Sequence, residues 1–338
     1  MKATIYYGPK NIELEDRPKP SVGPRDALIK NVRAGICGTD LTAYLYNGDA
    51  VSIFKDNEFG HEMVGRIEEV GSEVKDLHVG DRVFVNPTRC KRGGMAACDM
   101  AGAFSEYVLV EEAKLGDNLF ILADHVSYDD AVLCEPLSVS THGKNVANVK
   151  NSDKVAIYGA GTIGLGALLA LKAQGVKEIV VIDINDSRLK IAESHGAKTI
   201  NPSSENLKTA LENIMGQTYS HIGLPVPDVD VYIDAAGAPN IPIEFLSMAK
   251  ENAVLSVLAV YKQNTELNFS MVMSSEAIVR GSCGYSIKDI EEVLSYLHDG
   301  KIKGSDLITH HFKHTDIKEA FEMAASGDKA LKVVIDYE

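Results

Sequence analysis

Three short stretches in the first 142 residues contain side chains that bind transition metals. Cys37 lies in the stretch GICGTD, His61 and Glu62 are adjacent in FGHEMVG, and Glu135 follows a cysteine in LCEPLSVSTHG. A thiolate, an imidazole and a carboxylate together form a ligand set that suits Zn²⁺ with one coordination position left open. Zinc at such a site acts as a Lewis acid and lowers the pKa of an alcohol, whose carbon can then release a hydride to a nicotinamide ring.

Each of these stretches alone has a simpler interpretation. A single cysteine is usually a small buried hydrophobic residue, and an adjacent His–Glu pair is usually a feature of packing or of the surface. The combination favours a metal site, because it supplies three kinds of ligand together. Thr39, two residues after Cys37, adds a hydroxyl that could pass a departing proton towards solvent.

Residues 153–183 have the pattern of a dinucleotide-binding site. An apolar strand is followed by a turn with the spacing G-x-G-x-x-G, by a helix and by a second apolar strand that ends in an acidic residue. We predict the first strand at 155–158, the helix at about 163–174 and the second strand at 179–182. This context distinguishes a nucleotide fingerprint from an ordinary glycine-rich turn.

Each residue of the fingerprint has its own expected role. Gly159 permits the tight turn, Gly161 lets the backbone approach a pyrophosphate, and Gly164 lets the helix lie close to the sheet. Backbone N–H groups at the start of the helix, at Thr162 and Ile163, face the phosphates, and the helix dipole favours their negative charge.

The acidic residue after the second strand predicts the cofactor. Asp183 would accept hydrogen bonds from a ribose hydroxyl, and its charge would repel a 2′-phosphate, so the sequence favours NAD over NADP. No arginine directly follows Asp183, but Arg188 lies further along the chain and leaves NADP as an alternative.

The two groups of residues lie in segments with different secondary-structure patterns. Residues 1 to about 140 contain strands separated by Pro, Gly and Asp turns, which we predict at 3–7, 26–33, 62–70, 82–85 and 105–109. From about residue 151 strands alternate with helices, which predicts a parallel sheet covered on both faces. We expect the chain after about residue 281 to divide between closing this sheet and returning to the first domain.

Composition excludes several classes of protein. A chain of 338 residues is long for one core, so two domains are expected. The net charge of −14 argues against nucleic acid or an anionic membrane as a partner. No apolar run reaches the roughly 18 residues that span a bilayer, and the N-terminus lacks a signal-peptide core. Five cysteines do not suggest a disulfide framework. We expect a cytoplasmic protein.

The ordered motifs resemble those of a known enzyme family. GICGTD, GHEMVGRIEEVG, GDRV, GAFSEYVLV, CEPLSVSTHG and GAGTIGLG are similar, over essentially the whole chain, to the motifs of the zinc-dependent medium-chain alcohol dehydrogenases. The stretch CEPLS most resembles the polyol (sorbitol/xylitol) dehydrogenase branch. The stretch CGTDL is also similar to L-threonine and butanediol dehydrogenases.

The resemblance implies a role for each matching residue. Cys37, His61 and Glu62 match the positions that hold the catalytic zinc, with water completing its coordination. Glu135 matches a carboxylate that contacts the zinc directly or through that water, and Thr39 matches the hydroxyl of the proton relay. The three glycines and the aspartate of the fingerprint match the NAD site.

The resemblance also implies an architecture. It predicts an α/β protein with a GroES-like β-barrel catalytic domain, residues 1–145 and 285–338. The second domain, residues 146–284, would be an NAD-binding Rossmann domain with a doubly wound parallel sheet, and the active site would lie in the cleft between domains. We expect one catalytic Zn²⁺ per subunit and a homodimer or homotetramer. The strand at 253–259 could supply a dimer edge by sheet extension.

The sequence departs from the family pattern in two places. Most relatives have a lobe in which four closely spaced cysteines bind a structural zinc, whereas the corresponding stretch CKRGGMAACDMAG contains only Cys90 and Cys98. Two thiolates cannot by themselves complete a four-coordinate site, so we expect no structural zinc; a site that also uses Asp99 is the alternative. Thr42 stands where many relatives place a histidine, which leaves the details of proton relay and substrate selection open.

Other candidate residues are expected to have structural roles. His142 would pack at the junction between domains, and Cys283 would lie in the core near the nicotinamide. The cluster of His310, His311 and His314 has the composition of a metal site, but its place at a strand end favours solvent exposure.

The expected function is the oxidation of a secondary alcohol, in a polyol or a diol, to a ketone with NAD as the acceptor. Oxidation of L-threonine or 2,3-butanediol is the alternative within the same class, because the metal and cofactor motifs are shared. An NAD-binding redox sensor and a zinc-free reductase are alternatives from outside it. Neither has a need for the four metal-binding side chains together.

Overall fold

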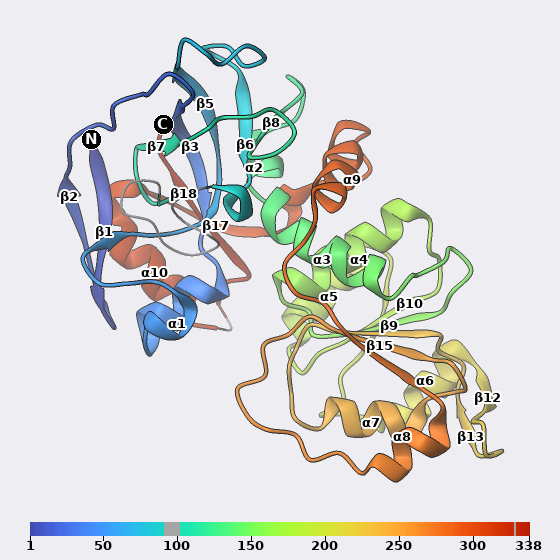
Figure 1. Ribbon diagram of the computed structural model, residues 1–338. Coiled ribbons are helices and arrows are strands. Elements are labelled where there is room, and N and C mark those ends of the chain that lie inside the picture. The colour runs from blue at the N-terminus through green and yellow to red at the C-terminus, as the bar shows by residue number, and fades with distance from the viewer. Residues whose placement is uncertain (91–101, 328) are drawn as a thin grey trace. The chain divides into compact units, whose positions relative to one another are not determined.

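The computed structural model describes residues 1–90, 102–327 and 329–338. It divides the chain into two compact units: unit 1 comprises Met1–Glu135 and Leu297–Glu338, and unit 2 comprises Pro136–Tyr296 (Figure 1). The chain therefore begins in unit 1, forms unit 2 from one continuous segment and then returns to unit 1. The boundaries expected from the sequence, after residues 145 and 284, stay a prediction.

Unit 1 is built mainly from antiparallel strands. Its larger sheet has seven strands in the order β17-β18-β3-β5-β6-β8, and β7 also pairs with β3. These strands are β3 Ala27–Gly35, β5 Glu62–Val70, β6 Arg82–Val85, β7 Tyr107–Val110, β8 Leu119–Ile121, β17 Ile308–Lys313 and β18 Lys332–Asp336. The smaller sheet, β2-β1-β4, consists of β1 Lys2–Gly8, β2 Asn11–Asp16 and β4 Asn57–Glu58.

Aromatic packing fixes the helices of unit 1 on its strands. The rings of Phe59, Phe104 and Phe321 are all buried, with centroids 5.0 to 5.7 Å apart. Phe321 belongs to α10 (Ile317–Ala325), and its ring also lies 5.2 Å from that of Tyr44 in α1 (Gly38–Leu45). Each such ring pair contributes about 0.5–1.5 kcal/mol beyond area burial. The cluster therefore holds α1, which follows Cys37, against the core.

Unit 2 contains a six-stranded parallel sheet. Its order is β11-β10-β9-β14-β15-β16, and every neighbouring pair is parallel. The strands are β9 Val155–Tyr158, β10 Ile179–Ile182, β11 Lys198–Ile200, β14 Val231–Asp234, β15 Val254–Val257 and β16 Ile278–Gly281. Two halves wind outwards from the central pair β9 and β14, which is the doubly wound arrangement that binds dinucleotides. The predicted fold class is confirmed.

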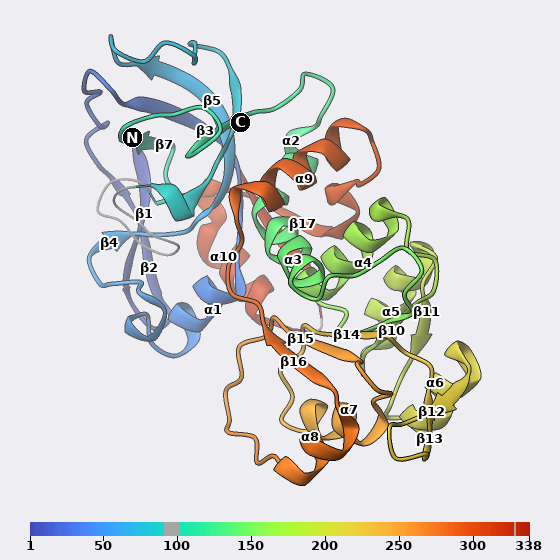
Figure 2. The ribbon, with the colours of Figure 1, turned by 45° about the vertical axis from the view of Figure 1, so that its right-hand side comes forward.

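Helices cover both faces of this sheet (Figures 1 and 2). One face carries α4 Thr162–Gln174 and α5 Asp186–Ser194, and the other carries α6 Leu207–Met215, α7 Ile241–Met248 and α8 Phe269–Ser275. Strands β9 and β10 are buried along their whole length, which explains why they read as continuous apolar runs and not as alternating ones. Helices α3 (Cys134–Val146) and α9 (Ile287–His298) each cross the division between the units. Among the described helices none is long and apolar enough to span a membrane.

The structure overturns three of the expectations. The segment 253–259 contains β15, which pairs on both sides, so it is not an edge; the outer strand is β16. Cys283 is exposed and does not lie in the core. His314 is buried and not solvated, because it lies in the η4 turn (His314–Asp316) after β17, where the chain turns inwards.

Burial of His314 predicts a loss of stability at low pH. Desolvation lowers the pKa of His314 to about 4, and its Nε2 lies 2.9 Å from Thr4 Oγ1 and 3.0 Å from the Phe104 carbonyl. The unfolded chain binds this proton near pH ~6.5. The neutral ring therefore contributes its full stability above about pH 6.5, and the contribution is lost as the pH falls towards 4.

Between pH 7.5 and pH 5 this residue should cost the wild type about 2 kcal/mol of its free energy of unfolding. A His314→Gln variant should lack that part of the decline, as measured by urea unfolding at both pH values. The matched control is His78→Gln, because that ring is exposed in unit 1. An equal decline in wild type and His314→Gln would contradict the assignment.

Candidate active site

Three of the predicted metal-binding side chains converge in unit 1. The Cys37 sulfur, a ring nitrogen of His61 and a carboxylate oxygen of Glu62 all lie within 4.8 Å of one another. His61 and Glu62 are buried, and Cys37 is half-buried. Ligand atoms of a tetrahedral zinc site are roughly 3.3–3.8 Å apart, given bond lengths of about 2.0–2.3 Å. The group would need to contract by only about 1 Å, so its chemistry and its size both fit zinc.

Strand register brings these residues to one end of the large sheet. β3 and β5 are antiparallel neighbours, and Gly35 at the end of β3 pairs with Glu62 at the start of β5. Cys37 follows two residues later as the N-cap of α1. The donors therefore come from the point where one strand ends and its neighbour begins.

Gly35 leaves the space that the Glu62 side chain occupies. A Cβ atom at this position would overlap Glu62 Oε2 and would lie 2.9 Å from Lys332 Cε. Any other residue at position 35 would have to displace the carboxylate. The glycine is needed here for room and not for an unusual backbone conformation.

Asp40 belongs to the site although the sequence analysis did not select it. Its Oδ2 accepts a hydrogen bond of 2.9 Å from the Cys37 N–H, and its Oδ1 lies 3.8 Å from His61 Nδ1. Both Oδ1 and Nδ1 are buried and lack a hydrogen-bond partner, so a small shift would join them. Metal-bound histidines commonly donate their second N–H to a carboxylate. The available signal was the spacing of a capping box, with Asp40 three residues after the N-cap.

Electrostatics at this site are dominated by burial and by close charges. Burial raises the pKa of Asp40 to about 6, although His61 opposes the shift. Burial lowers the pKa of His61, but the negative charges of Cys37 and Asp40 outweigh it and leave that pKa well above its ordinary value. The site therefore attracts positive charge.

Lys332 is a second residue that the sequence analysis missed. It begins β18, its side chain is 3% exposed, and its ammonium forms an ion pair with Glu62 and donates a hydrogen bond of 2.9 Å to the Ile36 carbonyl. Burial lowers the pKa of Lys332, but the charges of Glu62 and Cys37 raise it by a larger amount, so the net shift of this pKa is upward. No local pattern could identify this lysine, because it lies far from the other site residues in sequence.

Glu135 lies near the group of three, and Thr39 is close to Cys37 in sequence. Glu135 is buried in the first turn of α3, and its charge contributes to the raised pKa of both His61 and Lys332. Glu135 is not a member of the close group of ligand atoms in the described residues. Thr39 is half-buried in the first turn of α1.

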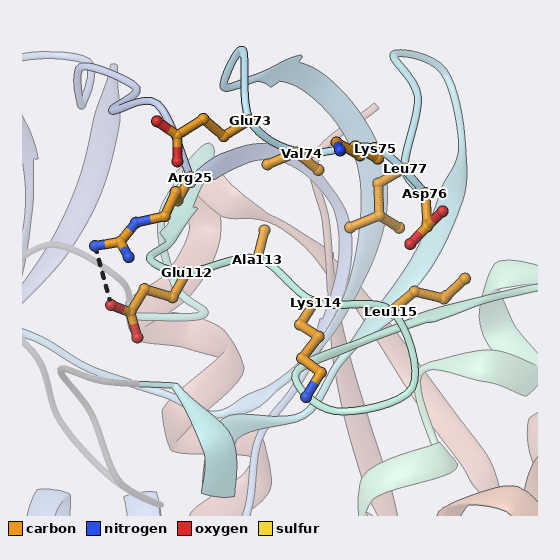
Figure 3. Close-up of a pocket in the computed structure, with 10 residues that line it drawn as sticks. All are labelled: Arg25, Glu73, Val74, Lys75, Asp76, Leu77, Glu112, Ala113, Lys114 and Leu115. Atoms are coloured by element: carbon orange, nitrogen blue, oxygen red, sulfur yellow. Dashed lines mark ion pairs between the residues drawn. The ribbon is translucent and has the colours of Figure 1, made fainter.

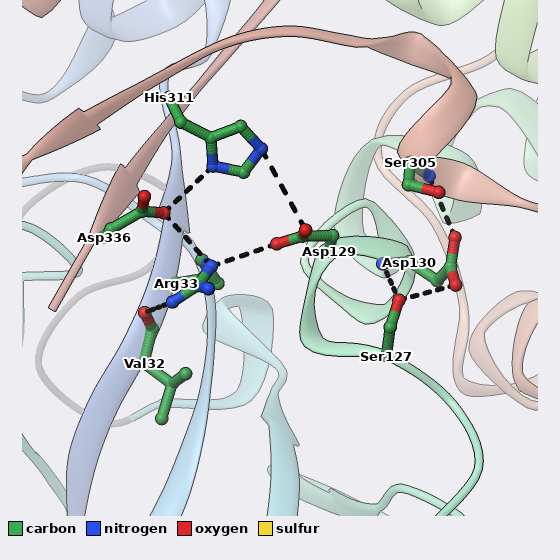
Figure 4. A network of polar contacts seen from close by, with 8 residues as sticks. All are labelled: Val32, Arg33, Ser127, Asp129, Asp130, Ser305, His311 and Asp336. Carbon is green, nitrogen blue, oxygen red and sulfur yellow. Dashed lines mark hydrogen bonds and ion pairs between the residues drawn. The ribbon is translucent and has the colours of Figure 1, made fainter. Parts of the chain in front are cut away.

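A network of ion pairs joins the segments that lead to these residues (Figure 4). Arg33 on β3 lies 2.9 Å from Asp129 in α2 (Tyr128–Ala131) and 3.1 Å from Asp336 on β18. His311 on β17 completes the network, 3.0 Å from Asp336. Because β3 continues to Cys37, α2 leads to Glu135 and β18 starts at Lys332, the network fixes the approach of three segments to the site.

The glycine turn of unit 2 has the geometry expected of a nucleotide site. Gly159 has a φ of 95°, which only glycine adopts readily. A Cβ atom on Gly164 would overlap the Gly159 carbonyl oxygen, so the helix can pack this closely only with glycine. A Cβ on Gly161 would meet nothing within 4 Å, so this position is open on the side where a pyrophosphate would lie. Thr162 and Ile163 begin α4 directly after it.

The turn itself holds Asp183 in place. Its Oδ2 accepts a 2.6 Å hydrogen bond from the Ala160 N–H, and its Oδ1 accepts one of 2.8 Å from the Asn185 N–H. A carboxylate has about four acceptor positions, so two remain for the hydroxyls of a ribose. Arg188 lies in the first turn of α5.

Asp234, at the end of the neighbouring strand β14, anchors a second loop of unit 2. It is fully buried and accepts hydrogen bonds from the Ala236 and Gly237 N–H groups and, at 2.5 Å, from the Tyr261 hydroxyl. The loop thus follows the central strand pair where a doubly wound sheet binds its ligand.

Other clusters lack the features of these two sites. A second close group consists of His221, Glu251 and Glu276, and all three are exposed. The Nδ1 atom of His221 faces Glu251 and its Nε2 atom faces Glu276, which is the arrangement of a histidine that forms two ion pairs. His142 Nδ1 donates a hydrogen bond of 2.9 Å to the Asp289 carboxylate within unit 2. Cys90 is half-buried, whereas Cys98 and Asp99 lie outside the described residues.

A surface pocket of about 510 Å³ lies elsewhere in unit 1 (Figure 3). Its charged lining residues are balanced in sign: Arg25, Lys75, Lys114, Glu73, Asp76 and Glu112. Arg25 and Glu112 already form an ion pair at 3.4 Å. None of the predicted site residues lines this pocket, and its balanced charge selects no class of ligand.

Comparison with known proteins identifies the family of the chain. Residues 23–118 match the alcohol dehydrogenase GroES-like domain, and residues 162–299 match the zinc-binding dehydrogenase family. The chain is 33% identical to an L-idonate 5-dehydrogenase from Vitis vinifera, over 99% of this chain and 94% of that protein. It is 30% identical to an (R,R)-butanediol dehydrogenase from Bacillus subtilis (strain 168), over 99% of both chains.

The fold agrees with a solved structure as well. The crystal structure of 2R,3R-butanediol dehydrogenase from Bacillus subtilis superimposes with a TM-score of 0.86 at 26% identity, covering 100% of this chain and 99% of that one. The GroES-like and Rossmann domains inferred from the motifs are confirmed. The chain belongs to the zinc-dependent medium-chain alcohol dehydrogenase superfamily and is an alcohol dehydrogenase that uses zinc and a nicotinamide cofactor.

Proposed function

We propose that the protein oxidises a secondary alcohol of a polyol or a diol to a ketone, with NAD as the hydride acceptor. The observation that carries the proposal is the convergence of Cys37, His61 and Glu62 within 4.8 Å in a largely buried site. A redox sensor that performs no chemistry has no need for this set, because burying several ionisable groups together is costly.

Cys37, His61 and Glu62 would hold one zinc ion. The metal, when bound, supplies a Lewis acid that makes a hydroxyl proton easier to remove. Glu62 is the nearer carboxylate, so we assign it as the direct ligand, with Glu135 acting beside it. Thr39, half-buried two residues from Cys37, has the hydroxyl to accept the proton and pass it on.

NAD would bind in unit 2 on the residues of the fingerprint. Gly159, Gly161 and Gly164 shape the pyrophosphate turn, and the N–H groups at Thr162 and Ile163 face the phosphates. The fixed carboxylate of Asp183 has acceptor positions left for a ribose, and its charge opposes a 2′-phosphate. We assign NAD as the preferred cofactor, with Arg188 as a further contact near the ribose.

The relatives support a substrate with neighbouring oxygen groups. L-idonate 5-dehydrogenase and butanediol dehydrogenase are named for a sugar acid and a diol, and both substrates have hydroxyl groups on adjacent carbons. L-Threonine is the competing substrate within the family. Thr42, which stands where many relatives place a histidine, donates its hydroxyl to the Gly38 carbonyl within its own helix.

The first experiment measures NADH formation over a panel of sugar alcohols, vicinal diols and L-threonine. We expect activity on polyols or diols that a zinc chelator abolishes and added zinc restores. Cys37→Ser should lower kcat/KM by at least about 10³-fold while NAD still binds, since the two sites lie in different units.

Cys283→Ser is the matched control, because this thiol is exposed in unit 2 and is not among the residues assigned to either site. Full activity in Cys37→Ser would refute the zinc assignment. Activity on L-threonine alone would replace the polyol assignment, and chelator-insensitive activity would indicate a reductase that does not use the metal.

A second prediction concerns cofactor choice. Asp183→Ala removes the negative charge that faces a 2′-phosphate, so the ratio of kcat/KM for NADP to that for NAD should rise by at least about tenfold. Asp186→Ala is the control, because this exposed carboxylate lies at the start of α5. An unchanged ratio in the Asp183 variant would place ribose selection elsewhere.

We also propose a homo-oligomer that assembles through β16. This strand is the outer strand of the parallel sheet, and Val279 within it is exposed. Phe269 and Met273 on the adjoining α8 are also more than 70% exposed. An exposed strand edge beside apolar side chains favours pairing with a second copy.

Light scattering should give a mass of at least twice the 36.6 kDa subunit. Val279→Lys should shift it towards the monomer, because a charge on the edge opposes pairing. Lys262→Glu, outside the strand, should leave the mass unchanged. A monomeric wild type would exclude the assembly.

A further inference from the structure

The Glu62 carboxylate has a second cationic partner besides the metal that the proposed function assigns to it. Lys332 begins β18, and its ammonium forms an ion pair with Glu62 Oε2. Glu62 is 1% exposed and the Lys332 side chain 3% exposed. Water therefore does not screen the pair, and the interaction is stronger than it would be at the surface.

The ammonium cannot easily leave this position. It also donates a hydrogen bond of 2.9 Å to the Ile36 carbonyl, one residue before Cys37. Its stem passes the end of β3 over Gly35, where a Cβ atom would lie 2.9 Å from Lys332 Cε.

Several negative charges surround the ammonium. Glu62, Cys37 and Glu135 all interact with it, and these are the residues that would face the zinc. A metal ion at the site would therefore share its anions with a fixed positive charge. Two cations that depend on the same carboxylate compete for it and repel each other.

We propose that Lys332 is a positioning residue that holds one oxygen of Glu62, so that Glu62 binds zinc through its other oxygen only and releases it easily. The proposal rests on the assignment of Glu62 as a zinc ligand. It gives the zinc site a lower affinity than its donors alone would produce, and it keeps one coordination position open for the alcohol.

The test is the equilibrium transfer of zinc from the zinc-loaded protein to a chromophoric chelator. Lys332→Met removes the charge but keeps the length of the stem, so zinc should bind about tenfold more tightly, the lower end of the usual effect of such surrounding residues. Lys332→Arg keeps the charge, and its affinity should stay within about twofold of wild type. Unchanged or weaker zinc binding in Lys332→Met would overturn the proposal.

A spectrum provides a readout that a packing role would not affect. In the cobalt-substituted protein, a Glu62 that binds through both oxygens raises the coordination number, so the d–d absorption of Lys332→Met should weaken relative to wild type and Lys332→Arg. Lys332→Gln serves if the methionine variant does not fold. In a Glu62→Gln background the lysine substitution should no longer tighten zinc binding, because the shared carboxylate is gone.

The outcome for Cys37→Ser distinguishes the two levels of inference. If the wild type binds no zinc, or if Cys37→Ser and Glu62→Gln bind it as tightly as wild type, the proposed metal site is wrong. If both variants lose zinc while Lys332→Met leaves affinity and spectrum unchanged, the metal site stands and only the role of Lys332 is refuted.

Discussion

The burial of several acidic groups at the meeting point of β3 and β5 is the constraint on which unit 1 depends. Cys37, Glu62 and Glu135 are placed where water is largely excluded, and each buried ion costs several kcal/mol unless it is compensated. Lys332 supplies part of the compensation, and the raised pKa of Asp40 reduces the cost by making its ionised form less favourable. A divalent cation bound as in the proposed function would supply the rest. The donors are thus arranged as a site that is satisfied only when a cation is present.

The cofactor site in unit 2 solves the opposite electrostatic problem. Its ligand is an anion, and the chain offers backbone N–H groups and a helix start in place of charged side chains. Asp183 is fixed at the edge of the turn, where the proposed function has its carboxylate discriminate between a ribose and a ribose phosphate. One unit therefore binds a cation with side chains, and the other binds an anion with its backbone. Glycines leave room in both sites: Gly35 for the Glu62 carboxylate in unit 1, and Gly164 for the close approach of α4 to the turn in unit 2.

The sequence predicted the elements whose pattern is local. β5, β6 and β10 match the predicted strands residue for residue. β6 and β10 are dense runs of β-forming residues next to turn residues, and β5 is bounded by glycines at positions 60 and 71. β2 was missed, since its sequence NIELED is half acidic and reads as a loop, although it pairs along the whole of β1. The strand predicted at 253–259 exists as β15, but it lies inside the sheet and not at its edge. Apolarity indicates that a strand is buried and does not indicate the order of strands in the sheet.

The same distinction applies to the site. Cys37, His61, Glu62 and the glycine fingerprint were identified because each lies in a motif with recognisable spacing. Asp40 had a local signal that was not used. Lys332 had none, since only the pairing of β18 with β3 places it beside Glu62. His314 was wrongly predicted to be exposed for a related reason. The sequence shows that three histidines lie near a strand end, but it does not show that the η4 turn buries one of them.

The path of the chain determines the order in which the two sites are completed during synthesis. Unit 2 is one continuous segment, Pro136–Tyr296, whereas unit 1 needs Leu297–Glu338 to finish its large sheet. A growing chain on the ribosome therefore exposes the residues that bind the dinucleotide in a complete domain while β3 still lacks β18 as its neighbour. Cys37, Glu62 and Glu135 are synthesised before unit 2, whereas Lys332, the partner of Glu62, is synthesised after it. Unit 2 can therefore be complete while unit 1 still waits for its last strands.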